Sequence, residues 1–326
     1  MKTEILKVLR ESGGYVSGQQ LCDSFGVSRT AVWKVIEQLK KEGYEIEAVR
    51  SRGYRLVESP DVMGQAELES LIRTRWAGRP VVYASETDST NIQAKALGEK
   101  GASHGTLFVA DRQTAGKGRR GRSWESPAGT SIYMTVLLRP GFLPSRAPML
   151  TLVMALSVAE GITGETGLLA QIKWPNDIVV NRKKVCGILT EMSAEVDYIN
   201  YVVTGAGINV NTECFPREIA GTATSLYIEG GARVRRAKLA ARIMERYEEN
   251  YETFLAAEDL SGLKSAYNRL LVNRGKEVRI LEPGNEYEAV ASGINDTGEL
   301  IVTARDGSRR AIFAGEVSVR GVYGYV

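Results

Sequence analysis

The sequence has few of the residues on which metal sites, disulfides and nucleophilic triads depend. Its 326 residues include one histidine, His104, and three cysteines, Cys22, Cys186 and Cys214. One histidine excludes a multi-histidine metal site, and a Ser-His-Asp triad would depend wholly on His104, which lies in a predicted turn. The cysteines are odd in number and have no C-x-x-C spacing, which is typical of reduced structural thiols. We predict no multi-histidine or cysteine metal site and no disulfide framework, and the sequence leaves other metal ligands unassigned.

The chain also lacks long apolar runs and a large net charge. No apolar stretch near the N-terminus reads as a secretory signal, and the most apolar run, Met149–Ala159, is too short to span a bilayer. We expect a cytoplasmic protein without membrane contact, with Met149–Ala159 as a buried helix. The formal net charge is only +3, so any contact with nucleic acid must be local.

Acidic residues are missing from one glycine-rich stretch, Arg112–Trp124. It contains three glycines and five cations: Arg112, Lys117, Arg119, Arg120 and Arg122. Clustered like charges repel unless an anion offsets the cost, and glycine lets backbone N–H groups approach a ligand. We interpret the stretch as a loop that closes over a polyanionic small molecule. A solvated basic loop or a nucleic-acid patch is the alternative.

The same stretch matches the G-x-G-x-x-G dinucleotide pattern at Gly116–Gly121, but the context does not fit. A predicted strand precedes it, at Thr106–Ala110, yet Ser123–Pro127 does not begin a helix and no acid follows at the required distance. Nor is it a Walker A loop, because Gly118 stands where that motif has Ser or Thr.

Patterning divides the chain into three predicted domains: 1–60, 65–270 and 272–326. In the first, Ser17 opens a helix through Phe25, a Gly26-Val27 turn follows, and Ser28 caps a helix that ends near Gly43. This is a helix-turn-helix at about 18–37, and the hairpin at 44–56 makes it a winged helix.

Exposed positions of the second helix and the hairpin tip carry the predicted DNA contacts, because they face a groove in such domains. These residues are Arg29, Thr30, Trp33, Lys34, Arg50 and Arg52, with Arg55 as a further cation on the hairpin. A winged helix used only for protein contacts is the alternative.

The other two segments have different patterns. Helical and strand patterns alternate over 65–270, which predicts a mixed α/β domain with one large sheet. The predicted strands are Leu107–Ala110, Ile132–Leu138, Ile178–Val180 and Tyr201–Thr204, and the helices are Gln65–Thr74, Ser89–Leu97, Arg146–Glu160 and Arg235–Leu255. After about Val272, short strands separated by turns, the first at Pro283–Asn285, predict a small SH3-like β-barrel.

Three further motifs in the central segment carry polar or small residues at element ends. Ser89, Thr90 and Asn91 begin a helix, where free N–H groups suit a polar ligand, although simple capping is the better explanation of this motif taken alone. Lys173–Asp177 places a cation, an aromatic, an amide and an acid around a proline. Gly205–Val210 ends a strand with small residues that permit close approach.

Taken in order, these motifs resemble the biotin–protein ligases, and specifically their bifunctional members, which are also biotin operon repressors. The resembling motifs are Asp88–Asn91, Gly116–Arg122, Lys173–Asp177, Lys184 with Gly187, Gly207–Asn209 and Gly315–Ser318. The resemblance implies condensation of biotin with ATP and Mg²⁺ to biotinyl-5′-adenylate, then transfer to a lysine of a biotin carboxyl carrier protein. It also implies a homodimer that binds operator DNA when the adenylate is present.

The resemblance implies a role for each matching residue. Lys184 and Arg119 are the expected catalytic residues, because they steady charge at the reacting centre. The expected biotin contacts are Ser89, Thr90, Asn91, Gln113, Lys117, Gly118, Arg119, Lys184 and Gly187. The expected nucleotide contacts are Gly116, Arg119, Arg120, Arg122, Trp124, Lys173, Asn176, Asp177 and Asn209.

Two positions depart from the family pattern. Lys117 stands where arginine is usual, which keeps the charge but loses the planar fork. Cys186 stands where a small residue is usual; we interpret it as packing, with alkylation beside the reacting site as a possible liability. Two other functions stay open: a lipoate-attaching enzyme, and a transcription factor whose α/β domain only senses a ligand.

Overall fold

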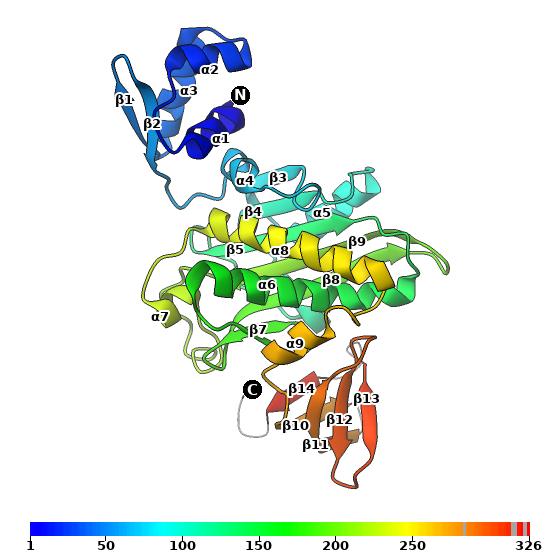
Figure 1. The fold of residues 1–326 in the computed structure, drawn as a ribbon. Coiled ribbons are helices and arrows are strands. Elements are labelled where there is room, and N and C mark those ends of the chain that lie inside the picture. The colour runs from blue at the N-terminus through cyan, green and yellow to red at the C-terminus, as the bar shows by residue number, and fades with distance from the viewer. Residues whose placement is uncertain (283–284, 314–317, 322–324) are drawn as a thin grey trace.

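The computed structural model describes residues 1–282, 285–313, 318–321 and 325–326. Three bodies follow one another along the molecule, with the N-terminal helices at one end, a large sheet layered by helices in the middle and a small sheet at the other end (Figure 1). The turn expected at Pro283–Gly284 and most of the Gly315–Ser318 motif, Gly315–Val317, lie outside the described residues.

The N-terminal body is the predicted winged helix. Ser17 Oγ accepts a hydrogen bond from the Gln20 amide at 3.0 Å, and Gly26 ends that helix in the left-handed conformation. Ser28 caps the next helix through the Ala31 amide at 3.2 Å. Its elements are α1 Lys2–Ser12, α2 Gly18–Phe25, α3 Arg29–Lys41, β1 Glu45–Val49 and β2 Gly53–Glu58, and the two strands pair antiparallel.

A buried carboxylate joins this body to the central one. Glu67, on α4 (Gln65–Leu71), is 1% exposed and accepts hydrogen bonds from Arg10 at 2.6 Å and from the Tyr44 hydroxyl at 2.7 Å. Arg235, just before the long helix α8, binds its other oxygen at 2.9 Å. Removing one partner of such a buried group leaves a charge uncompensated, so this junction is specific rather than a loose linker.

The central sheet has seven strands in the order β3-β4-β5-β9-β8-β7-β6. Only β3 and β4 run parallel among these neighbours, so the sheet is mixed as predicted. The strands are β3 Val81–Thr87, β4 Leu107–Gln113, β5 Ser131–Leu138, β6 Gln171–Lys173, β7 Asp177–Val180, β8 Lys183–Ala194 and β9 Ile199–Asn209. β3, β6 and β8 were not predicted, and β9 extends well beyond the predicted strand.

Helices cover both faces of this sheet. The helix α5 (Thr90–Glu99) packs on one face with Phe108, Leu137 and Tyr201. On the other face α6 and α8 run side by side across the strands (Figure 1). These and the remaining helical elements are α6 Leu150–Thr166, α7 Leu226–Gly230, α8 Arg236–Ala257, α9 Lys264–Leu270 and the 3₁₀ turns η1 Arg119–Gly121 and η2 Pro144–Met149.

The buried helix predicted around Met149–Ala159 is longer than expected. The 3₁₀ turn η2 and the helix α6 together, Pro144–Thr166, span 23 residues and are apolar enough to cross a membrane by length and composition alone. Its most apolar window is 72% buried inside the protein, against the sheet and α8, so the run is the buried core helix that was predicted.

The C-terminal body is a five-stranded antiparallel sheet in the order β13-β12-β11-β10-β14. Its strands are β10 Glu277–Glu282, β11 Asn285–Ile294, β12 Leu300–Ala304, β13 Arg309–Ile312 and β14 Ser318–Gly321. Closure into a barrel stays a prediction. The sheet lies below α9, on the side of β6 and β7 (Figure 1).

Candidate functional site

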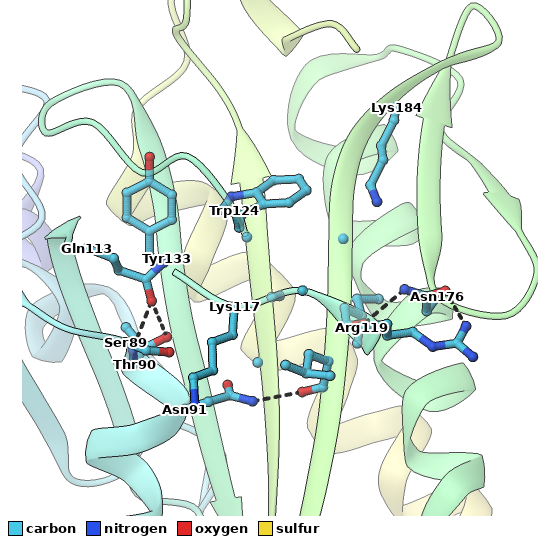
Figure 2. A pocket seen from close by; sticks show the side chains of 17 residues that line it. Ser89, Thr90, Asn91, Gln113, Lys117, Arg119, Trp124, Tyr133, Asn176 and Lys184 are labelled. Carbon is cyan, nitrogen blue, oxygen red and sulfur yellow. Dashed lines mark hydrogen bonds between the residues drawn. The ribbon is translucent and has the colours of Figure 1, made fainter. Parts of the chain in front are cut away.

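One pocket in the central body gathers most of the predicted site residues. It lies where the beginning of α5 meets the middle of β8 and β9, with the glycine–arginine loop across it (Figure 2). Its lining includes eleven predicted residues: Ser89, Thr90, Asn91, Gln113, Lys117, Gly118, Arg119, Trp124, Asn176, Lys184 and Gly187.

The beginning of α5 forms a neutral, hydrogen-bonded end of the pocket. Ser89 is the N-cap residue, but its side chain makes no capping bond, and Gln113 takes that role from β4. The Gln113 carboxamide oxygen accepts from the Thr90 amide at 2.8 Å and from the Thr90 hydroxyl at 3.1 Å. Capping was the alternative to ligand binding for Ser89; this side chain is therefore available to a ligand.

The side chain of Asn91 is held in a fixed orientation beneath this end of the pocket. Its amide oxygen accepts from the Thr135 hydroxyl at 2.8 Å, and its amide nitrogen donates to Glu191 at 2.8 Å. Burial alone would raise the pKa of Glu191, but hydrogen bonds from Lys95 and Asn91 bring it below its usual value. A Cβ on Gly205 would come within 2.0 Å of Asn91 Oδ1, so glycine is required there by a side chain rather than by a ligand.

The glycine–arginine loop folds back on itself as a small hairpin. The Gly118 amide donates to the Arg122 carbonyl at 2.7 Å, and the Trp124 amide donates to the Gly116 carbonyl at 2.9 Å. Arg120, at the tip, has φ 56° and ψ 40°, the left-handed region that L-residues other than Asn and Asp rarely adopt. The tip therefore carries local backbone strain at a predicted ligand-binding loop.

Trp124 lies over the glycines of the sheet at the centre of the site. A Cβ on Gly207 would come within 2.7 Å of Trp124 Nε1, and one on Gly187 within 3.0 Å of its ring. Lys184 Nζ stands 5.2 Å from a ring centroid of Trp124, in cation–π range. The small residues of β8 and β9 thus make room for an aromatic platform beside the lysine.

Two cations define the other end of the pocket. Arg119 donates to the Asn176 amide oxygen at 2.8 Å, and Lys184 pairs with Asp177 at 2.6 Å. Burial, and then the charge of Arg120, lower the pKa of Arg119, while Asp177 acts in the opposite direction. Figure 2 shows Arg119 directed toward Asn176 and Lys117 directed toward Asn91. The pocket therefore joins a neutral polar end to a cationic end.

Six other predicted residues lie outside the lining of this pocket: Gly116, Arg120, Arg122, Lys173, Asp177 and Asn209. Asn209 is buried and donates to the Thr224 carbonyl at 3.1 Å, which makes it a tie between β9 and the following loop in this structure. Gly116 is packed under Trp124, since a Cβ there would lie 2.4 Å from the Trp124 carbonyl. Lys173 is 5% exposed and lies over the ring of Tyr325.

The structure adds lining residues that the sequence did not single out. Tyr133 borders the pocket from β5, and its hydroxyl donates to the Pro127 carbonyl at 3.1 Å. Burial raises the pKa of Tyr133 to about 12. Ile188 and Leu189 of β8 complete an apolar wall. Every residue of β5 is buried, so hydropathy alone does not show which side chains face the pocket.

The predicted DNA contacts are on the outer surface of the winged helix. Arg29, Thr30, Trp33 and Lys34 are exposed on α3, with Trp33 54% exposed. Arg52 stacks over the Tyr15 ring at 4.1 Å from its centroid, and Arg55 pairs with Glu47 at 2.8 Å, so the hairpin cations are held in place. Arg50 is exposed at the hairpin tip.

Cysteine and histidine are rare in this chain, and Cys186 and His104 are both packed against other parts of the protein. Cys186 is fully buried, and burial raises the pKa of its thiol far above the usual range, so it packs as predicted and the proposed alkylation liability is wrong. His104 Nδ1 accepts from the Arg139 amide at 3.0 Å, and its ring packs 4.5 Å from that of Trp76. Among the described residues, no group of three or more His, Cys, Asp or Glu is arranged to hold a metal.

Comparison with known families identifies the same three bodies. Residues 2–55 match an HTH domain, 83–209 the biotin/lipoate A/B protein ligase family and 275–320 the biotin protein ligase C-terminal domain. The bifunctional ligase/repressor BirA of Bacillus subtilis (strain 168) is 37% identical over 322 residues, 98% of each chain. The relative of the same name from Escherichia coli (strain K12) is 29% identical and covers 97% of this chain and 96% of its own.

A solved structure supports the assignment from geometry. The biotin protein ligase from Aquifex aeolicus, in complex with biotin and ATP, superposes with a TM-score of 0.65 at 32% identity, over 74% of this chain and 98% of that chain. Fold and full-length identity agree: the chain belongs to the biotin–protein ligase family and has the domain composition of its bifunctional ligase/repressors.

Proposed function

We propose that this protein condenses biotin with MgATP to biotinyl-5′-adenylate and then transfers biotin to a specific lysine of a biotin carboxyl carrier protein. One observation carries the proposal: a single pocket places a neutral hydrogen-bonding end beside two cations, Arg119 and Lys184. Biotin has a neutral ring system at one end and a carboxylate at the other. Such a pocket suits the ring system at α5 and the carboxylate, where it meets ATP, at the cations.

In the first step two anions must meet. The biotin carboxylate attacks the α-phosphorus of ATP, an acyl–phosphate bond forms, and pyrophosphate leaves. Lys184 lies beside Trp124, where it offsets charge that develops between carboxylate and phosphate, and Arg119 approaches from the loop. The side chains of Arg120 and Arg122 are exposed on the loop, where they are placed to meet phosphates as the loop closes.

Magnesium fits this end of the site through oxygen donors, which it prefers. Asn176 and Asp177 supply an amide and a carboxylate, but Asp177 already contacts Lys184 and Tyr325. We therefore assign Mg²⁺ chiefly to the ATP phosphates, whose charge it neutralises when bound.

In the second step the mixed anhydride is already activated, so no covalent enzyme intermediate is required. The lysine amine of the carrier attacks the acyl carbon, an amide bond forms, and AMP leaves with the bonding electrons. Until then, Lys117, Gly118 and Arg119 close over the adenylate and keep water from it.

We also propose that the adenylate-bound protein dimerises and represses transcription of biotin biosynthesis genes. The winged helix presents Trp33, Arg29 and Lys34 on one exposed helix face, and Arg50 and Arg52 on the hairpin. Two copies related by a dyad would read two separated half-sites. The adenylate must then favour the dimer, because a ligand shifts an equilibrium only by its differential affinity for the two states.

The proposed division of labour assigns 1–60 to DNA, 65–270 to biotin and ATP, and 272–326 to support of the site, in a cytoplasmic protein. A separate hydrophobic core within the first segment, around Leu6, Leu21 and Ile36, supports its treatment as a unit.

Pyrophosphate release from MgATP tests the enzymatic proposal, with biotin and lipoate as parallel substrates and mass spectrometry of the retained product. Release with biotin alone and a retained biotinyl-adenylate support it. Biotin binding without release would make the protein a sensor only, and release with lipoate instead would make it a lipoate-attaching enzyme. DNA affinity that is indifferent to biotin plus ATP would contradict the repressor role.

A further inference from the structure

The carboxylate that pairs with Lys184 is held from a second side. Asp177 begins β7, and its Oδ1 lies 2.6 Å from Lys184 Nζ. Its other oxygen, Oδ2, accepts a hydrogen bond from the hydroxyl of Tyr325, 148 residues later in the chain. One carboxylate therefore links the lysine at the reacting centre to the C-terminal segment.

Tyr325 is fixed in this position by its surroundings. The ammonium group of Lys173 lies 3.3 Å from the centroid of its ring, a cation–π contact, and the ring packs with the buried cluster of Val179, Val272 and Val326. Gly321 of β14 leaves the space that this segment needs, because a Cβ there would come within 2.4 Å of the Val326 backbone.

A second contact from the C-terminal body reaches the turn that precedes β7, but it has a different role from that of Tyr325. Trp174 Nε1 donates to the Gly298 carbonyl at 3.0 Å, and the Trp174 ring is buried. This bond holds the turn that precedes β7, whereas Tyr325 holds the Asp177 side chain itself. The two contacts can be separated by mutation.

We propose that Tyr325 is a positioning residue for adenylate formation: it fixes the orientation of the Asp177 carboxylate and, through it, that of Lys184. A carboxylate anchored at Oδ2 cannot turn freely about its Cβ–Cγ bond, so Oδ1 keeps the Lys184 ammonium group beside Trp124. Pre-organised charges act in the transition state without reorganisation, so loosening them lowers the rate of the chemical step. This inference rests on the proposed ligase function and adds a residue to its site.

The first test is Tyr325→Phe, which removes only the hydroxyl. We expect kcat for biotin-dependent pyrophosphate release to fall about fivefold, the size of one lost hydrogen bond, while the KM for biotin stays within about twofold. The biotin end at α5 is not touched by this change. The matched control is Tyr287→Phe on β11 of the C-terminal sheet, where the ring lies under Arg310.

A double-mutant cycle tests whether Tyr325 acts through Asp177. With Asp177→Ala as background, Tyr325→Phe should cause no further loss, because its partner is gone. Full additivity of the two losses, or a wild-type kcat for Tyr325→Phe alone, would overturn the proposal. Equal thermal unfolding midpoints for wild type and Tyr325→Phe would show that the lower kcat does not come from a smaller fraction of folded protein.

A chemical readout keeps the inference separate from enzyme activity. Lys95 pairs with Glu191 at 2.7 Å, much as Lys184 pairs with Asp177, and serves as internal reference for acylation by a dilute N-hydroxysuccinimide ester. Tyr325→Phe should raise the labelling rate of Lys184 relative to Lys95 about threefold, because its partner is released. An unchanged ratio overturns the proposal. If the unmodified protein releases no pyrophosphate with biotin, the proposed function fails while the labelling ratio still decides this inference.

Discussion

The two ends of the pocket are built on opposite principles. At the α5 end, polar side chains are largely buried and bonded to one another: Gln113 to Thr90, and Asn91 to Thr135 and to the Glu191 carboxylate. At the loop end, the cations Lys117, Arg120 and Arg122 are exposed to solvent on a hairpin held mainly by its own backbone bonds. One end is completed on folding, and the other is completed by its ligand.

The difference follows from the charge of what each end binds. A neutral head group gains affinity from a rigid set of donors and acceptors, because little must be ordered on binding. A triphosphate must be met by several cations, and these repel one another in a closed arrangement until the anion is present. An exposed loop lets water screen the cations beforehand and keeps the pocket open for entry.

The largest effect is expected at the reacting centre. Lys184→Ala should slow biotin-dependent pyrophosphate release about 100-fold, as the loss of one oxyanion donor does. Single-turnover kinetics with saturating biotin and MgATP measure it. The matched control is Lys183→Ala, one residue away on β8. A wild-type rate for Lys184→Ala would remove this residue from the chemistry.

A smaller effect is expected when the loop loses one arginine side chain. Arg119→Gly should leave folding intact and speed escape of the adenylate about 10- to 100-fold, the range for a lost charge-assisted hydrogen bond. Gel filtration after incubation with labelled biotin and MgATP measures retention. Arg112→Ala, which removes a cation at the start of the same stretch that pairs with Glu86 instead, is the control. Full retention by Arg119→Gly would contradict the role of the loop as a cover.

Substitutions at two glycines of β9 should distinguish the two ends of the pocket most clearly. A Cβ on Gly205 would meet Asn91 Oδ1 at 2.0 Å, whereas one on Gly207 would meet Trp124 Nε1 at 2.7 Å. Gly205→Ala should raise the KM for biotin about tenfold, the range for overpacking in a rigid site, and Gly207→Ala should mainly raise the KM for ATP, by less. Steady-state kinetics with each substrate varied measure both. Similar changes in the two constants for both variants would mean that the ends are not independent.

The smallest effect is expected at Lys117, which stands where the family usually has arginine. Lys117→Arg should change turnover by no more than about threefold and lengthen adenylate retention, because a planar fork can bind two oxygens at once. The retention assay of the Arg119 variant measures it. Shortened retention would show that Lys117 serves Glu191, whose pKa its charge helps to lower, rather than the ligand.

Much of this architecture could be predicted from the sequence because it depends on local chemistry. Ser17 and Ser28 mark helix starts because a hydroxyl there satisfies free amides, and the cations of 112–122 mark the ligand loop because no acidic residue lies among them in the sequence. Tyr133 was not predicted because all of β5 is buried: Ser131, Tyr133 and Thr135 alternate with apolar residues, but this alternation does not show that their face borders a pocket. Nor does any local pattern bring Tyr325 to Asp177, since that contact depends on how the C-terminal sheet docks.

Hydrogen exchange read by mass spectrometry tests the contrast between the two ends most directly. Without ligand, the amides of α5 around Thr90 and Asn91 should already exchange slowly, while those of residues 114–124 exchange fast. Addition of biotin and MgATP should slow the loop strongly and leave α5 nearly unchanged. A loop that is already protected without ligand, or an α5 segment that becomes protected only with ligand, would contradict the account.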